Sequence, residues 1–267
     1  MLLKRVVTSI FLFSGLLLVL WANAFFPAFT IAASICAILG VWEFYRMVSA
    51  SGKGRPALLL GLMLTLLFVI APQLKWNHES GILVSIAVTL PLLWIILRRN
   101  HQDACASWAF TLAGILYLGW LGSRYTALIQ LDSGYKWIVL ALFCTFASDT
   151  TAYFAGGLIG RHKMAPSISP AKSWEGAFGG MAGAIVVGAL TSWILNLPLS
   201  LCQAIALAAA TSIFAQAGDL VESLFKRNMG AKDSGTALPG HGGILDRVDS
   251  ILFAGLAVYY YVVFIVN

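Results

Sequence analysis

Long apolar runs, separated by short polar stretches, set the pattern of this chain. The first run follows Lys4-Arg5 and reaches about Trp21, and eight more follow it. Each run is near the ~20 residues that a helix needs to cross the hydrocarbon core of a bilayer. The later runs lie near residues 25–44, 56–74, 81–97, 107–123, 137–158, 176–196, 200–223 and 248–266. We therefore predict an all-α polytopic integral membrane protein with about nine transmembrane helices.

The first run allows a second interpretation, because the small residues Ala22-Asn23-Ala24 after it are typical of a signal-peptide cleavage site. The next apolar run begins at Phe25, almost at once, which favours a helical hairpin anchored by an uncleaved first span. We see no internal repeat and no linker long enough to hold a soluble domain. We expect a single membrane domain, 1–267, with N-terminal spans in 1–135 and catalytic helices and cytoplasmic loops in 136–267.

The composition supports a membrane protein and excludes several other classes. Hydrophobic residues make up 60% of the chain and charged residues 10%, whereas soluble globular proteins have about 25% charged residues. The formal net charge of +6 comes from basic residues in loops, where membrane orientation and anionic headgroups or substrates explain them better than nucleic acid does. The four cysteines form no CxxC pair, so neither a disulfide framework nor a zinc site is indicated.

The distribution of the basic residues predicts the orientation of the spans. With a cytoplasmic N-terminus, nine spans place 14 of the 17 basic residues on the cytoplasmic side, as the positive-inside tendency requires. The three on the opposite side are Lys75, Arg124 and Lys136. Arg124 lies close to the end of the fifth span and makes that span ambiguous. The polar stretch Gln216–Ser250 is therefore expected in the cytoplasm.

Charge is concentrated in Gln216–Ser250, which holds five of the six carboxylates that follow residue 150. Ionisable groups at a membrane edge are costly and mark functional sites by default. Asp219 lies a turn or two deeper than the basic end of its helix, where an unpaired carboxylate is costly and requires a cation. Lys226 and Arg227 at that end are consistent either with a solvated helix end or with a phosphate site.

The next span begins with Asp246-Arg247-Val248-Asp249, in which the two carboxylates are one helical turn apart. Carboxylates that converge from two helix ends form a hard-cation site of the kind that Mg²⁺ uses with substrate phosphates. We predict metal ligation by Asp219 and Asp246, with Asp249 next. His241, between glycines, is equally consistent with a metal ligand or base and with a hydrogen-bonding loop residue.

Two regions upstream add candidates. Asp149 is consistent either with helix packing or with a polar cavity near the cytoplasmic end of its span. In the loop that follows, Lys172 stands beside a helix N-terminus, which favours anions, so we predict that it binds phosphate. Ser173 is expected to cap that helix, and Glu175 suits the helix dipole slightly better than ligand contact. Glu43, near the end of the second span, is interpreted as an interfacial anchor.

A small-residue seam for tight helix contact is predicted in the seventh span. The seam has a small residue at every fourth position: Gly176, Gly180, Ala184 and Gly188.

One long pattern resembles the C-terminal pattern of phosphatidate cytidylyltransferases, integral-membrane enzymes also called CDP-diacylglycerol synthases. It reads Ser223-Leu-Phe-Lys226-Arg227-x4-Lys232-Asp233-x-Gly235-x3-Pro239-Gly240-His241-Gly242-Gly243-x2-Asp246-Arg247-x-Asp249. Two upstream pieces are also similar to that family, Asp149-x3-Tyr153 and Ser169-Pro170-x-Lys172-Ser173-x-Glu175-Gly176. Residues 1–135 match only in hydropathy.

The resemblance implies an all-helical membrane fold, a homodimer, Mg²⁺ dependence, and the reaction of CTP with phosphatidic acid to CDP-diacylglycerol and pyrophosphate. The phosphate monoester of phosphatidic acid is its own nucleophile, so the enzyme has to hold two anions together and neutralise the leaving group. One or two divalent cations would serve. Catalytic roles are predicted for Asp219, Asp246, Lys226 and Arg227. Substrate contacts are predicted for Asp149, Lys172, Ser223, Lys232, Asp233, His241 and Arg247.

Two other classes remain open at this point. A secondary transporter of an anionic solute also uses intramembrane carboxylates, but its usual repeated halves with interrupted helices at mid-membrane are not evident. A membrane kinase or phosphatase that acts on lipid phosphates would keep the site and change the reaction. We favour the cytidylyltransferase, in the inner membrane of a bacterium, with its active site on the cytoplasmic side.

Overall fold

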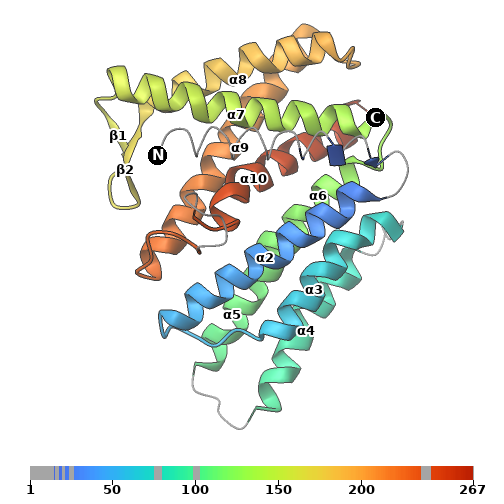
Figure 1. Ribbon diagram of the computed structural model, residues 1–267, viewed down its shortest axis with the longest axis vertical. Helices are drawn as coiled ribbons and strands as arrows, with labels where there is room; N and C mark the ends of the chain where they lie inside the picture. The colour runs from blue at the N-terminus through green and yellow to red at the C-terminus, as the bar shows by residue number, and fades with distance from the viewer. Residues whose placement is uncertain are drawn as a thin grey trace. The chain divides into compact units, whose positions relative to one another are not determined.

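The computed structural model describes residues 15, 18, 19, 22, 23, 27–74, 80–98, 103–235 and 242–266 (Figure 1). These residues form two compact units. The first contains the chain up to Gln130 together with Met229–Asp246, and the second contains Leu131–Asn228 and the chain from Arg247 on. The polar segment Met229–Asp246 therefore groups with the N-terminal helices. The expected division of one membrane domain into 1–135 and 136–267 stays a prediction.

The first unit is a bundle of helices with an apolar core. Tyr45 is among its largest buried side chains: it is 2% exposed, and its hydroxyl donates a hydrogen bond of 2.6 Å to the carbonyl of Thr111. A Cβ atom at Gly61 or Gly114 would overlap the Tyr45 ring, so glycine allows the helices to approach it closely. The helices are α2 (Ala28–Ala50), α3 (Leu58–Ile70), η1 (Ala71–Leu74), α4 (Ser80–Ile96), α5 (Ala104–Gly114), η3 (Ile115–Trp120) and α6 (Leu121–Leu128).

The second unit contains the two longest helices and a short hairpin. Its elements are α7 (Gly134–Ile159), β1 (Lys163–Ala165), β2 (Ser169–Ser173), α8 (Trp174–Ile194), α9 (Leu201–Asn228), η4 (Val262–Val266) and α10 (Leu245–Tyr261), of which the first two residues belong to the first unit. Helix α8 lies alongside α7 (Figure 1). The four small residues of the predicted seam in α8 are all buried. A Cβ at Gly180 would lie 2.9 Å from the carbonyl oxygen of Ser148 on α7, so the predicted packing role is confirmed.

Six helical segments of the described chain are long and apolar enough to cross a membrane, and Leu58–Leu74 and Gly81–Ile96 are shorter apolar helices. These eight segments match the second to ninth predicted spans, and the all-α membrane fold is confirmed. The first predicted span lies almost wholly outside the described residues, so the total of nine stays a prediction. The ambiguous fifth span is helical through Arg124 to Leu128, and the Arg124 guanidinium lies 5.4 Å from the Trp120 ring centroid.

A two-stranded antiparallel sheet, β1 with β2, stands where the sequence predicted only a loop. The strands have three and five residues, which is too short for a clear alternating pattern. The predicted cap of the next helix is confirmed, because the Ser173 hydroxyl accepts a hydrogen bond of 3.2 Å from the amide of Gly176. Strand β2 therefore leads directly into a capped helix.

Candidate metal and phosphate site

Three carboxylates of the second unit converge at the ends of two helices. Asp219 and Glu222 lie on α9 and Asp249 lies on α10, and one ligand atom from each falls within 4.8 Å of the other two. Asp219 and Glu222 are three residues apart, so they share a helix face. Glu222 is 1% exposed and Asp249 is 7% exposed. Buried carboxylates this close together repel one another unless cations lie between them.

Two lysines supply part of that positive charge. The Nζ atom of Lys172, from β2, lies 2.7 Å from Oδ2 of Asp219, and the Nζ atom of Lys226 lies 2.6 Å from Oε2 of Glu222. Both lysine side chains are largely buried, at 22% and 16% exposure. The sequence predicted phosphate contacts for both residues, and the structure places both ammonium groups beside the carboxylates.

Asp149 of α7 belongs to the same neighbourhood, since it is within range of charge interactions with Asp219 and Lys172. Together with Glu222 and Asp249 there are then four carboxylates and two lysines, with a formal charge of −4 + 2 = −2. An excess of negative charge around three clustered carboxylate ligands is the chemistry that hard divalent cations require. These residues therefore fit a divalent ion such as Mg²⁺.

The hairpin and the start of α8 place Lys172. The carbonyl of His162 accepts a hydrogen bond of 2.9 Å from the amide of Trp174, which closes the hairpin onto the helix. Glu175 lies in the first turn of α8 as predicted, and its Oε1 atom lies 2.6 Å from Nδ1 of His162. Arg227 donates from Nε to the carbonyl of Ile168 in the hairpin turn, at 3.3 Å. Contacts with α8 and α9 thus hold the hairpin.

Asp246 belongs to the first unit, where its carboxylate accepts hydrogen bonds from two backbone amides. Its Oδ2 atom is 3.1 Å from the amide nitrogen of Ser234 and 2.8 Å from that of Gly243. Gly242 has φ +81°, a conformation that L side chains rarely adopt, and a Cβ there would lie 2.6 Å from Oδ2 of Asp246. Asp246 therefore holds the ends of the segment Ser234–Gly243, and its predicted role as a metal ligand stays a prediction.

The remaining predicted residues have varied surroundings. The hydroxyl of Ser223 donates to Oδ1 of Asp219 at 3.4 Å. Lys232, Asp233 and Arg247 are exposed. His241 lies outside the described residues. Site roles for these residues remain predictions.

The comparison with known families decides what kind of protein carries this site. The sequence model of the Cytidylyltransferase family matches residues 3–265. The chain belongs to the Cytidylyltransferase family. It is 35% identical over 237 residues to the phosphatidate cytidylyltransferase of Bacillus subtilis (strain 168), with 87% of each chain covered. The relative of the same name from Staphylococcus epidermidis is 34% identical over 221 residues, 83% of this chain and 84% of the relative. The one from Synechocystis is 32% identical over 267 residues, 88% of each chain.

In this member of the Cytidylyltransferase family, two acidic residues matter more in the structure than the sequence suggested. Glu222 received no individual role from the sequence, although its i, i+3 spacing from Asp219 was a usable signal. Glu43 was interpreted as an interfacial anchor, and this is wrong because its side chain is 1% exposed. Its Oε2 atom instead accepts a hydrogen bond of 2.9 Å from the amide of Leu245, 202 residues away.

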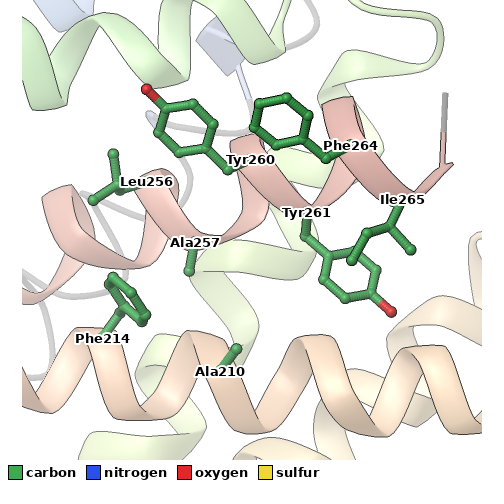
Figure 2. A pocket seen from close by; sticks show the side chains of 8 residues that line it. All are labelled: Ala210, Phe214, Leu256, Ala257, Tyr260, Tyr261, Phe264 and Ile265. Carbon is green, nitrogen blue, oxygen red and sulfur yellow. The ribbon is translucent and has the colours of Figure 1, made fainter.

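An apolar groove of about 370 Å³ runs between α9 and the α10–η4 helix (Figure 2). Figure 2 shows Phe214 and Ala210 on the α9 side and Ala257 and Tyr261 on the side of α10 that faces α9. Phe214 is five residues from Asp219 along α9, which is about 7.5 Å at 1.5 Å per residue. The groove and the three-carboxylate group thus lie on the same pair of helices.

Proposed function

We propose that this chain transfers the cytidylyl group of CTP to phosphatidic acid and forms CDP-diacylglycerol and pyrophosphate. The observation that carries the proposal is the group Asp219, Glu222 and Asp249 with its two lysine partners, in a chain of the Cytidylyltransferase family. An oxygen of the phosphatidate phosphate attacks the α-phosphorus of CTP. The bond from that phosphorus to the bridging oxygen breaks, and pyrophosphate leaves with the electron pair.

The residues of the site match the needs of this reaction without a protein nucleophile, because a phosphate monoester is largely ionised at neutral pH. We propose that Asp219, Glu222 and Asp249 hold Mg²⁺, with Asp246 as a further predicted ligand. When bound, the ion would neutralise charge on the phosphates. Lys172 and Lys226 would bind phosphate oxygens and orient the two anions toward each other. Arg227, Lys232 and Arg247 are proposed as further phosphate contacts.

A site at the cytoplasmic edge of the membrane would suit one substrate from water and one from the bilayer. We propose that the acyl chains of phosphatidic acid stay among the membrane helices, with the groove of Figure 2 as one place for them. Removing an acyl chain into water would cost about 0.8 kcal/mol per CH₂, and lateral entry avoids this cost. We further propose a bacterial inner-membrane location, a cytoplasmic site and a homodimer. The basic residues of the loops support the orientation.

The experiment that tests this function uses purified protein in vesicles that contain phosphatidic acid. CTP labelled at the α-phosphate should pass its label to lipid, and CTP labelled at the γ-phosphate should pass its label to pyrophosphate in equal amount. Label from the γ-phosphate in lipid would indicate a kinase. Release of inorganic phosphate from phosphatidic acid would indicate a phosphatase. Uptake of an anionic solute without chemistry would indicate a transporter.

A further inference from the structure

A carboxylate from the N-terminal helices binds the start of the last helix, α10. Glu43 lies on α2, two turns before that helix ends at Ala50. Its Oε2 atom accepts two hydrogen bonds, one of 2.9 Å from the amide of Leu245 and one of 3.3 Å from the hydroxyl of Ser234. All three residues belong to the first unit. Leu245 is the first residue of α10, so Glu43 binds the positive end of that helix dipole.

The backbone around Glu43 leaves no room for side chains. A Cβ at Gly235 would lie 2.6 Å from Oε1 and 2.8 Å from Cδ of Glu43, and one at Gly243 would also overlap this carboxylate. Neither glycine has a positive φ that would by itself require glycine. Close approach to Glu43, and at Gly243 also to the hydroxyl of Ser234, is therefore the physical reason for glycine at both positions.

A second tie joins the same helix to the same segment. The hydroxyl of Ser51, just after α2, lies 3.3 Å from the sulfur of Met229, at the start of Met229–Asp246. Burying a carboxylate is costly unless its oxygens are satisfied. Among the described residues, Oε1 of Glu43 has no hydrogen-bond partner. An apolar side chain would fill this space at a lower cost in folding free energy than a buried carboxylate does. The carboxylate of Glu43 therefore points to a role beyond packing.

We propose that Glu43 is a positioning residue for nucleotidyl transfer. Glu43 fixes the start of α10 and the segment that carries Lys232 and Asp233. The N-terminal helices, which otherwise serve as membrane spans, thereby contribute to positioning the reacting groups. The link to the metal site runs along α10, because Asp249 is one turn beyond Leu245 in the same helix. The role in transfer rests on the proposed function, whereas the hydrogen bonds that fix Leu245 do not.

The first test compares Glu43→Ala and Glu43→Gln with wild-type full-length protein in detergent. Ala removes both acceptors, and Gln keeps the length and one acceptor oxygen. Turnover should fall at least tenfold in E43A and by less in E43Q. Hydrogen–deuterium exchange at Gly243–Leu245 should be fastest in E43A and slowest in the wild type. Ser34→Ala, a buried polar residue of the same helix, is the control and should keep turnover within threefold of the wild type.

The second test is a double-mutant cycle with Gly235→Ala. The three atoms nearest to the added methyl group all belong to Glu43, so G235A should lower turnover in the wild type. It should cause no further loss in the E43A background, where those atoms are gone. This non-additivity is not expected from general destabilisation. If E43A does not fold, E43Q and G235A still test the contact, by faster exchange at Gly243–Leu245 in each.

The outcomes distinguish the positioning role of Glu43 from the proposed function of the chain. Wild-type turnover in E43A, unchanged exchange at Leu245, or losses from G235A that simply add to those of E43A would each overturn the positioning role. Absence of transfer from CTP to phosphatidic acid in the wild type would instead overturn the proposed function. In that case the exchange measurement would still show whether Glu43 holds the start of α10.

Discussion

The ammonium group of Lys172 lies 2.7 Å from Oδ2 of Asp219, and this ion pair connects strand β2 to the C-terminal half of α9. We predict that Lys172→Ala lowers turnover at least tenfold, because a charge-assisted contact of about 1.5–3 kcal/mol is lost. Steady-state kinetics with both substrates will measure the effect. Lys163→Ala, which removes an exposed lysine of strand β1, is the matched control and should have little effect. Equal kinetics for K172A and the wild type would remove the hairpin from the site.

The three-carboxylate group predicts a change in metal binding that does not depend on activity. Asp249→Asn and Glu222→Gln each remove one charge from a cluster with a formal excess of two, so both should weaken binding of Mn²⁺, used as a probe for Mg²⁺, at least tenfold. Electron paramagnetic resonance of free Mn²⁺ measures this in purified protein. Asp132→Asn, an exposed residue between α6 and α7, is the control. Wild-type affinity in both site variants would show that the ion binds elsewhere.

Two glycines with positive φ, Gly230 and Gly242, allow the effect of backbone strain to be distinguished from the effect of a steric clash with a neighbouring side chain. A Cβ at Gly230, φ +67°, meets nothing within 4 Å, whereas one at Gly242 meets Oδ2 of Asp246. Gly230→Ala should therefore cost only the left-handed strain, about 1–2 kcal/mol of unfolding free energy, and should keep its turnover. Gly242→Ala should also displace Asp246 and lower turnover at least tenfold. Similar turnover in the two variants would argue against a role for the Asp246 contacts.

The fold was largely predictable because a bilayer fixes the length and polarity of its spans. Eight segments lie where the apolar runs predicted them, and the cap at Ser173 was evident from local sequence. Contacts between distant segments were not evident. Glu43 meets Leu245 across 202 residues, and no local pattern distinguishes such a carboxylate from one at a membrane surface.

The candidate site was predictable in part, for a similar reason. Helical spacing places Asp219 next to Glu222, but only the three-dimensional arrangement shows that Lys172 and Lys226 neutralise these carboxylates. Asp246 and Asp249 are one turn apart in sequence, yet the first accepts backbone amides and the second joins the three-carboxylate group. Spacing shows which residues share a face and not which partner each one meets.

The proposed orientation predicts which loops face the cytoplasm. In a chain whose natural cysteines have been replaced, Ser167→Cys in the exposed hairpin turn should react with an impermeant thiol reagent only in inverted vesicles. Asp132→Cys, on the predicted opposite side, should react only in right-side-out vesicles. Prior addition of CTP and Mg²⁺ should slow labelling at position 167, because the hairpin carries Lys172. The reverse labelling pattern would contradict the cytoplasmic site.

The most direct test of the account is transfer of α-labelled CTP to phosphatidic acid by the Asp219→Asn variant. The amide keeps the size of the side chain and removes the charge that pairs with Lys172 and contributes to the three-carboxylate group. With equal amounts of folded protein and saturating Mg²⁺, we predict that the wild type forms labelled CDP-diacylglycerol and that the variant loses at least 99% of this rate, about 2.7 kcal/mol at 1.36 kcal/mol per factor of ten. A rate near that of the wild type would contradict the assignment of these carboxylates to the reaction.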